Sequence, residues 1–244
     1  MPRDKANYGV DAPTVVRNLF VVAVVGFVLL FVLPPRIVVG PVTLGLRPTF
    51  LGAAIGCTIG GVLMSVYSKF MKFRHRDRML ALVKWRGDEQ VLDVGTGAGL
   101  LLIGAAKKLT TGKGTGIDLW SKVDLSANTR ERTLLNAEIE GVKNKVEVVD
   151  GDATQMQFAD GIFDVVVSNL VIHNIPSRAG RDKACREIAR VLRPGGVVVI
   201  SDLAHTRDYK GAFAKAGLKI SPEALWSWGT FPPLRMIKAE KEKR

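Results

Sequence analysis

Cysteine and histidine are scarce in this sequence, and their scarcity excludes two common kinds of framework. The 244 residues include two cysteines and three histidines. Cys57 and Cys185 fall in a predicted membrane span and a predicted helix, so they imply a reduced compartment and no disulfide framework. The histidines are scattered and show no metal-ligand spacing with the cysteines. The sequence therefore indicates neither a disulfide-stabilised secreted scaffold nor a metal site.

Acidic residues are also few, with 23 Asp and Glu against 35 Lys and Arg and a formal net charge of +12. Much of the excess lies in residues 1–80, which hold ten basic and three acidic residues. The sequence has no basic stripe interleaved with aromatic residues, the pattern that would indicate a nucleic-acid surface. The charge therefore predicts anionic membrane lipid as a partner, and no nucleic acid.

Two long uncharged runs stand at the front of the chain. Leu19–Leu33 is fifteen apolar residues, and Thr49–Ser68 is twenty residues without a charge. A helix needs about 20 residues to cross a bilayer, and fewer when flanking basic side chains reach the interface. We therefore predict two transmembrane helices, at about 15–33 and 49–68, with Ile37–Val39 available to extend the first.

Two other interpretations of these runs stay open. A signal peptide also places basic residues before an apolar core, but no A-x-A-like cleavage site follows Leu33. A buried or interfacial hairpin is the second alternative. The runs are apolar on all faces, which argues against helices lying flat on a membrane.

The basic residues that flank the runs predict their orientation. The loop between the two runs holds only Arg36 and Arg47. The positive-inside rule then places both termini, and the domain after the second run, in the cytoplasm. The basic residues that precede the first run or closely follow the second are Arg3, Lys5, Arg17, Lys69, Lys72, Arg74, Arg76 and Arg78.

Glycines recur at four-residue spacing in the second run, at Gly52, Gly56 and Gly60. This doubled G-x-x-x-G pattern lets helix backbones approach closely in lipid. The partner is either the first span, where Ala23 and Gly26 offer small surface, or a second copy of the chain.

A glycine-rich turn follows the apolar segments. Asp93-Val94-Gly95-Thr96-Gly97-Ala98-Gly99 comes after a short apolar run and precedes a helix-like run, as in the first strand–turn–helix of a nucleotide-binding unit. A dinucleotide fingerprint would place its third glycine at the position of Leu100. The observed spacing disfavours that fingerprint, although a degenerate dinucleotide site and a structural turn stay open.

An acidic residue ends the next predicted strand. Asp118 lies nineteen residues after Gly99, where a carboxylate can accept hydrogen bonds from ribose hydroxyls. A helix N-cap is the alternative role. Further predicted strands end near Asp150 and Asn169, and ligands of open α/β sheets bind at such carboxyl ends.

The D-x-G-x-G-x-G spacing resembles the first motif of class I S-adenosylmethionine (SAM)-dependent methyltransferases. The phrase Glu187–Ser201, with its L-R-P-G-G, resembles the ubiquinone/menaquinone-biosynthesis-like (methyltransferase type 11-like) branch, and the resemblance covers roughly residues 88–240. It implies an α/β, Rossmann-like, seven-stranded sheet whose last strand is antiparallel. We expect a membrane region at residues 1–72 that does not build the cofactor pocket, and a methyltransferase domain at 73–244.

The resemblance also implies the site. SAM would be the cofactor, and the residues predicted to bind it are Asp93, Gly95, Thr96, Gly97, Gly99, Asp118, Leu119, Asp152, Ala153 and Asn169. A base is needed only when the nucleophile arrives protonated. His173 and His205 are the candidates, because they follow the fourth and fifth strands.

The absence of one motif narrows the class of molecule that could accept the methyl group. No N/D-P-P-Y/F follows the fourth strand, where the chain reads Ser168-Asn169-Leu170-Val171, which removes the usual amino-methylating nucleic-acid enzymes. A membrane-anchored enzyme that methylates a small lipophilic acceptor, such as a quinone precursor, phenol, thiol or lipid, is therefore expected. The alternatives are a non-catalytic SAM-binding membrane protein and a membrane-anchored nicotinamide oxidoreductase.

Overall fold

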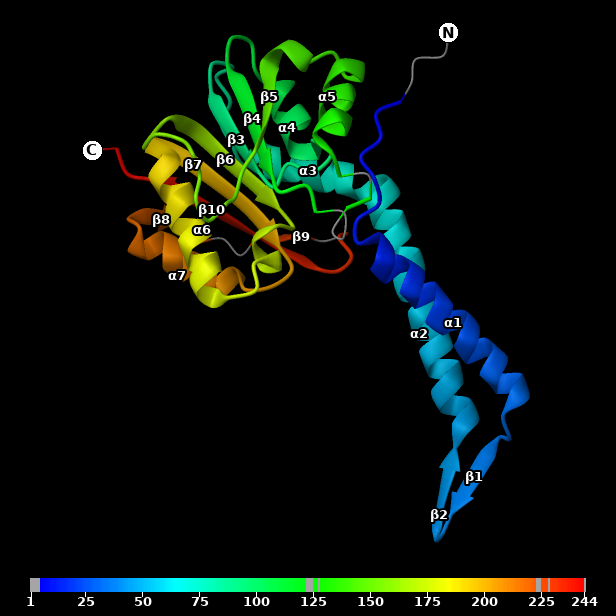
Figure 1. The fold of residues 1–244 in the computed structure, drawn as a ribbon. Coiled ribbons are helices and arrows are strands. Elements are labelled where there is room, and N and C mark those ends of the chain that lie inside the picture. Colours follow the sequence, from blue (N-terminus) through cyan, green and yellow to red (C-terminus); the bar gives the residue numbers. More distant parts are fainter. Residues whose placement is uncertain (1–4, 122–124, 127, 223–224, 228, 244) are drawn as a thin grey trace.

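The computed structural model describes residues 5–121, 125, 126, 128–222, 225–227 and 229–243. It has two parts, a long helical hairpin and an α/β domain, and the hairpin projects away from the domain (Figure 1). The hairpin and the domain are joined by an unbroken helical segment as well as by the residues before the first helix.

The hairpin consists of α1 (Pro13–Val32) and α2 (Leu46–Val66), and β1 (Arg36–Val39) pairs with β2 (Val42–Gly45) antiparallel at its far end. Both helices are long and apolar enough to cross a membrane. Because Leu33 precedes a proline, its backbone is extended and the first helix ends there. Ile37–Val39 therefore belongs to β1, and the expectation that it extends the first helix is wrong.

Small residues bring α1 and α2 together. A Cβ added to Gly26 would lie 3.0 Å from Ala54 Cβ, and one added to Gly61 would lie 2.9 Å from the Phe20 ring. Ala23 is buried in the same contact. Gly52 and Gly56 instead have no described atom within 4 Å of such a Cβ, so they do not face the first helix. Gly60 does face the first helix, since its added Cβ would lie 3.7 Å from Leu19. Contact of these glycines with a second copy of the chain stays a prediction.

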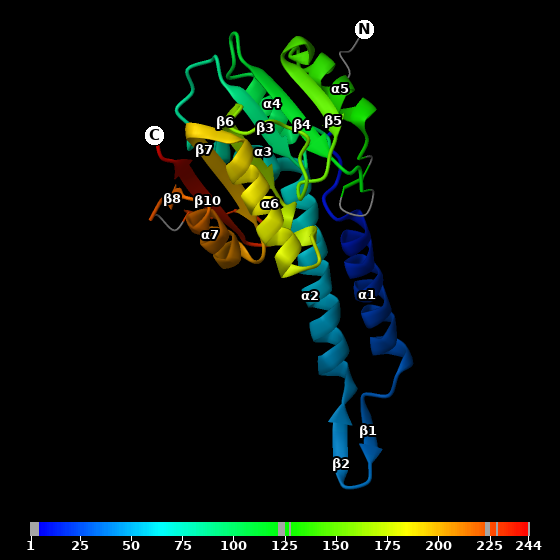
Figure 2. The ribbon, with the colours of Figure 1, turned by 60° about the vertical axis from the view of Figure 1, so that its left-hand side comes forward.

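The second helix does not end at the domain. A π-helical turn, η1 (Tyr67–Met71), carries it into α3 (Lys72–Ala81), so one helical segment runs from the hairpin onto the face of the sheet (Figure 2). The basic segment after the second apolar run is therefore helical.

The domain is built on one mixed sheet in the order β5-β4-β3-β6-β7-β10-β8, with β9 paired to β10. All strands up to β7 are parallel, and β10 is antiparallel to β7 and β8. This arrangement confirms the predicted seven-stranded sheet. The strands are β3 (Gln90–Val94), β4 (Lys113–Asp118), β5 (Val146–Asp150), β6 (Phe163–Asn169), β7 (Leu192–Asp202), β8 (Leu218–Ile220), β9 (Leu225–Ser227) and β10 (Leu234–Lys241).

Helices cover both faces of the sheet. Residues of α3 and of α4 (Leu100–Ala106) pack with β3, β6 and β7 in one apolar core, and α5 (Arg130–Ile139) lies beside α4. A second core lies between the opposite face and α6 (Arg178–Val191) with α7 (Thr206–Lys215). Short 3₁₀ turns, η2 (Lys143–Lys145) and η3 (Ile172–Asn174), complete the connections. The carboxyl ends of β3 to β7 thus share one edge of the sheet.

Residues 5–11, here called the N-terminal strap, pack on the domain rather than on the hairpin. Tyr8 is buried with Ala137 of α5. Asn7 exchanges two hydrogen bonds with Asn136, its N–H donating to Oδ1 at 2.8 Å and its carbonyl accepting from Nδ2 at 2.9 Å. Lys72 Nζ donates to two strap carbonyls at 2.8 Å each. The division at residue 72/73 stays a prediction, but the packing does not follow it.

Candidate active site

The glycine-rich turn between β3 and α4 adopts a backbone that other residues rarely take. Gly95, Gly97 and Gly99 have φ angles of +73°, +54° and +85°. A Cβ on Gly95 would fall 2.2 Å from the Val171 side chain, and one on Gly97 would fall 2.9 Å from Leu125. Glycine is required here both by conformation and by space.

Asp93 and Thr96 hold this turn from inside. The Asp93 carboxylate is fully buried and accepts hydrogen bonds from Thr96 Oγ1 at 2.9 Å and from the Leu102 N–H at 3.0 Å. Burial raises the pKa of Asp93 to about 7. In this structure the two residues fix the turn on the strand, and their contact with a cofactor stays a prediction.

Asp118 ties the next strand to the same turn. Its Oδ2 accepts the Gly97 N–H at 2.8 Å, and its Oδ1 accepts the Trp120 N–H at 2.6 Å. A carboxylate offers about four acceptor positions. With Asn128 Nδ2 also 3.3 Å from Oδ1, Asp118 has about one position left for a hydroxyl group of a ligand, and its binding of ribose stays a prediction.

Asn128 is a member of this site that the sequence did not indicate. Its Nδ2 donates to the Ser121 carbonyl at 3.0 Å and lies 3.3 Å from Asp118 Oδ1. Its Oδ1 is buried without a hydrogen-bond partner among the residues that the structure describes. Buried acceptors are nearly always satisfied, so this atom marks a place for a donor from a ligand.

The remaining predicted cofactor residues line the edge of the sheet beyond Asp118. Leu119 is 71% exposed, as an apolar platform for a ring would be. The Gly151 N–H donates to the Asp118 carbonyl at 3.1 Å, which draws the end of β5 against the end of β4. Asp152 then forms a tight turn by accepting the Thr154 N–H at 2.7 Å, and Ala153 is partly buried beside it.

His173, on the turn after β6, is held by a buried carboxylate. Its Nδ1 lies 2.6 Å from Asp202 Oδ1, and its backbone N–H donates to Asp202 Oδ2 at 3.1 Å. Tyr209 Oη also donates to that carboxylate, at 3.2 Å. Asp202 lies at the end of β7 and is fully buried, whereas the His173 side chain is 20% exposed. The two side chains are within ion-pair distance, but Nδ1 makes no well-aligned hydrogen bond with any residue that the structure describes.

His205 is placed differently from His173. It precedes α7 with φ +58°, its side chain is 42% exposed, and its Nδ1 lies 3.9 Å from Asp208 Oδ2. It lines a shallow cavity of about 330 Å³ that also involves Arg207 and Arg235. The structure thus gives the two predicted histidines separate surroundings, and only His173 has a buried orienting partner at close range.

Comparison with known proteins identifies the kind of domain that carries this site. Residues 92–200 match a protein family described as a methyltransferase domain. These residues form a methyltransferase domain. The matched residues extend from β3 through the glycine turn, Asp118, Asn169 and His173 to β7, so the site described above lies within this domain.

Relatives of the methyltransferase domain come from several organisms. The chain is 36% identical over 124 residues to a ubiquinone/menaquinone biosynthesis C-methyltransferase of Bdellovibrio bacteriovorus, a match that covers 49% of this chain and 47% of the relative. The chain spans about half the length of the curated relatives it matches.

Solved structures show the same fold. A SAM-dependent methyltransferase from Aquifex aeolicus matches with a TM-score of 0.55 and 19% identity, covering 68% of this chain and 88% of that one. The [4+2]-cyclase SpnF matches with a TM-score of 0.60 and 17% identity, covering 70% and 81%. The second likeness illustrates that this fold alone does not fix the reaction.

SAM, the cofactor of the methyltransferase domain, fits the residues present. The side chains of Val171 and Leu125 lie over Gly95 and Gly97, so contact between SAM and the backbone of this turn stays a prediction. Asp118 has about one acceptor position left for a ribose hydroxyl, and the unpaired Asn128 Oδ1 lies near it. These two acceptors suit a neutral ribose.

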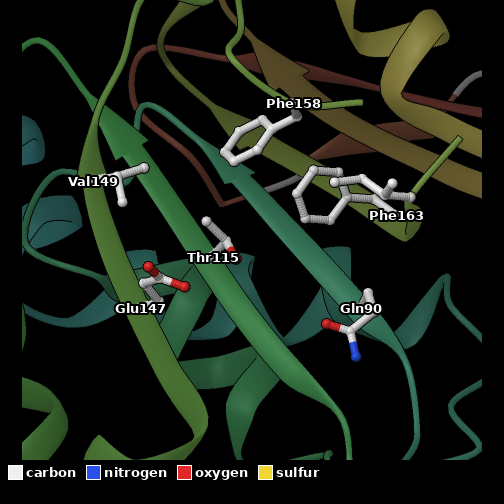
Figure 3. A pocket seen from close by; sticks show the side chains of 7 residues that line it. Gln90, Thr115, Glu147, Val149, Phe158 and Phe163 are labelled. Atoms are coloured by element: carbon white, nitrogen blue, oxygen red, sulfur yellow. The ribbon is translucent and has the colours of Figure 1, made fainter. Parts of the chain in front are cut away.

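A further cavity of about 260 Å³ lies elsewhere on the methyltransferase sheet (Figure 3). It forms because residues 151–162, between β5 and β6, contain no helix to cover the strands beneath them. Gln90, the first residue of β3, lies at one end of it. The cavity is therefore on a strand face and away from the carboxyl ends that carry the site. Its lining residues are Gln90, Thr115, Glu147, Val149, Phe158, Ile162 and Phe163.

Proposed function

We propose that this protein is a membrane-anchored methyltransferase that transfers a methyl group from SAM to a small lipophilic acceptor. The observation that carries the proposal is the joining of three parts at one sheet edge. These are the glycine turn, the Asp118 carboxylate bound to it at 2.8 Å, and the His173–Asp202 pair at 2.6 Å.

Each part has a distinct task in this proposal. Bound SAM supplies an electrophilic methyl group, which forms a bond to the acceptor while the broken carbon–sulfur bond leaves its electron pair on sulfur. The glycine turn and Asp118 fix the position from which the methyl group departs, so that the reaction gains from proximity and alignment. His173 Nε2 takes the proton of a protonated nucleophile, and the buried Asp202 carboxylate, 2.6 Å from Nδ1, lies where it stabilises the ring once it is charged.

Membrane anchoring is supported by the apolar surface that the hairpin leaves uncovered. Most side chains of α1 and α2 are not buried within the protein, unlike those of core helices, and apolar residues such as Val24 and Phe31 are exposed. Each helix has the roughly 20 residues needed to span a bilayer. We propose two spans, with both termini and the methyltransferase domain in the cytoplasm and the β1–β2 turn on the far side.

A lipophilic acceptor is supported by the anchor and by the relatives. An enzyme held at a bilayer gains most when its substrate partitions into lipid, because tethering raises the effective concentration of the pair. Among the relatives, the enzyme from Bdellovibrio bacteriovorus carries a name from quinone biosynthesis. A quinone precursor or related phenol is therefore the acceptor class that we propose first.

The cofactor site is tested by replacing Asp118 with Ala. The change leaves ribose hydroxyls without an acceptor and frees the Gly97 N–H, at a cost of about 1–3 kcal/mol, so SAM affinity should fall by about tenfold or more. Calorimetric titration of SAM measures it. Asp150→Ala is the matched control, because Asp150 is paired with Asp118 in the strand register but bonds to the exposed Trp120 ring. Equal affinities of the wild type and Asp118→Ala would remove Asp118 from the site.

The topology is tested with single cysteines. Cys57 and Cys185 are first replaced by Ala, and a cysteine is then placed at Thr43 in the β1–β2 turn or at Lys241 in β10. An impermeant maleimide added to intact cells should label the first position and not the second. Labelling of Lys241→Cys alone would reverse the orientation, and release of the protein by carbonate would contradict the spans.

The reaction itself is tested by incubating the full chain in vesicles with tritiated SAM and a membrane lipid extract, followed by mass identification of the labelled product. Label in a phenolic or quinonoid lipid supports the proposal. Tight SAM binding without transfer to any extract component would instead favour a non-catalytic SAM-binding membrane protein.

A further inference from the structure

Four polar residues meet where the membrane-side helix reaches the sheet, and we call them the junction cluster: Tyr67, His75, Asn169 and Ser201. Tyr67 opens the π-turn η1, and His75 follows in α3. Asn169 and Ser201 are register partners at the ends of β6 and β7. Tyr67 and His75 are 3% and 2% exposed. His75 Nε2 lies 2.7 Å from Ser201 Oγ, and the Asn169 side chain lies beside both the His75 ring and the Tyr67 hydroxyl.

The junction cluster is incomplete in its hydrogen bonding. The Tyr67 hydroxyl and Asn169 Oδ1 are both buried, and neither makes a well-formed hydrogen bond with any residue that the structure describes. A buried donor or acceptor without a hydrogen bond lowers the stability of the folded state. Native proteins rarely contain one unless a ligand, a water molecule or a functional role accounts for it. One hydroxyl group placed between these two atoms would satisfy both, because it can donate to Asn169 Oδ1 and accept from Tyr67.

The position of the cluster connects it with the proposed reaction. Val171, two residues after Asn169, has its side chain over Gly95 of the glycine turn. On the other side, α2 and η1 expose apolar side chains, including Val62, Val66 and Phe70, which is 66% exposed. The cluster thus lies between the apolar surface of the helix and the turn that holds the cofactor. π-Turns inside α-helices occur frequently at functional sites.

The charge of the cluster suits a neutral ligand. Burial lowers the pKa of His75 to about 4, so its ring is uncharged at pH 7. Asp11 acts electrostatically on Tyr67 and faces Lys72 at 3.6 Å, and Arg78 acts electrostatically on His75. The four side chains of the cluster are themselves uncharged, and a phenolic hydroxyl fits them because it brings no charge into a buried site.

We infer that the junction cluster is the acceptor-binding end of the active site, where Tyr67 and Asn169 hold the hydroxyl of a lipophilic phenol or quinol that arrives along α2. The inference rests on the proposed function and assigns Asn169, predicted above as a cofactor residue, to the acceptor. Tyr67 and Asn169 touch the anchored oxygen, and His75 positions Ser201 behind them. The proton of the reacting atom remains the task of His173.

The test is Tyr67→Phe in the full chain, reconstituted in lipid nanodiscs and titrated with a decyl-substituted hydroquinone. The affinity for this probe should fall about tenfold, the loss of one buried hydrogen bond. SAM affinity should not change. Because the removed hydroxyl makes no well-aligned hydrogen bond and only neighbours the Asn169 amide, the melting temperature should change little, whereas the loss of a structural hydrogen bond would lower it. Lys69→Met, on the same turn but exposed and outside the cluster, is the matched control.

A second variant tests whether Asn169 binds the same hydroxyl group as Tyr67. Asn169→Leu should weaken the hydroquinone to a similar extent, and the double variant should lose less than the two single losses combined, because both residues bind one hydroxyl. A wild type that does not bind the hydroquinone, or a Tyr67→Phe variant that binds it as the wild type does, overturns the inference. Neither result touches the proposed function, which fails separately if the wild type transfers no label from SAM.

Discussion

His173→Gln should lower kcat for methyl transfer by about 10²–10⁴-fold at pH 7, the usual contribution of a positioned general base. Glutamine cannot take the proton that His173 Nε2 would accept, although it can still reach the Asp202 carboxylate that now lies 2.6 Å from Nδ1. SAM binding should be retained, because the glycine turn and Asp118 lie on other strands. The rate is measured by transfer of tritiated methyl groups to the acceptor identified from the lipid extract.

His205→Gln separates the two histidines that the sequence put forward. We expect it to change kcat by less than threefold or so, since surface substitutions away from special features have small effects and this side chain is 42% exposed. A larger loss at His205 than at His173 would reverse the assignment. An unchanged kcat in His173→Gln would show that the acceptor arrives already ionised and needs no base.

Lys72→Met should have the largest effect on stability, lowering the free energy of unfolding by about 3–5 kcal/mol, as breaking a buried ion pair does. The Lys72 side chain is 4% exposed, donates to the carbonyls of Tyr8 and Gly9 and faces Asp11, so its loss leaves one buried and two partly buried acceptors without their donor. SAM affinity should fall as well. The N-terminal strap exchanges hydrogen bonds between Val10 and Ser126, on the segment that leads to Asn128.

Thermal unfolding and SAM calorimetry of the detergent-solubilised chain measure both effects of Lys72→Met. Lys69→Met, one turn earlier and exposed, removes the same charge without touching the N-terminal strap and should behave as the wild type. Equal stability and equal SAM affinity in the two variants would show that the N-terminal strap does not support the cofactor site. The same reasoning predicts that a chain starting at Phe73 loses SAM affinity, contrary to what the sequence alone indicates.

The parts of the site that the sequence predicts are those set by short-range spacing. Asp93 and the three glycines lie within seven residues, and their backbone needs are local, so the pattern alone identifies the turn. Asp118 follows because a strand end carries it to the same edge as the turn. The strand order and the antiparallel β10 come from the resemblance to the methyltransferase family, since periodicity does not specify how strands pair.

The parts that the sequence does not predict depend on contacts between distant segments. Asn7 and Asn136 are 129 residues apart, and nothing in the local sequence of either indicates the other. Asn128 lies in an irregular segment without periodicity, and Tyr67 looks like the end of an apolar run. Tyr67 is buried in the π-turn η1, which local sequence does not indicate. Tertiary structure therefore decides which polar residues join the site.

The unbroken passage from α2 through η1 into α3 makes the number of residues in this segment a fixed quantity. Each residue added to a helix rotates the chain beyond it by about 100° and advances that chain by about 1.5 Å. One insertion before Tyr67 would therefore rotate the hairpin relative to the sheet by about 100° around the axis of this helix. A change of about seven or eleven residues, close to two or three full turns, restores the orientation. In related chains we expect length variation to be absent from residues 46–81 and free to occur in the β1–β2 turn, which faces nothing that must be aimed.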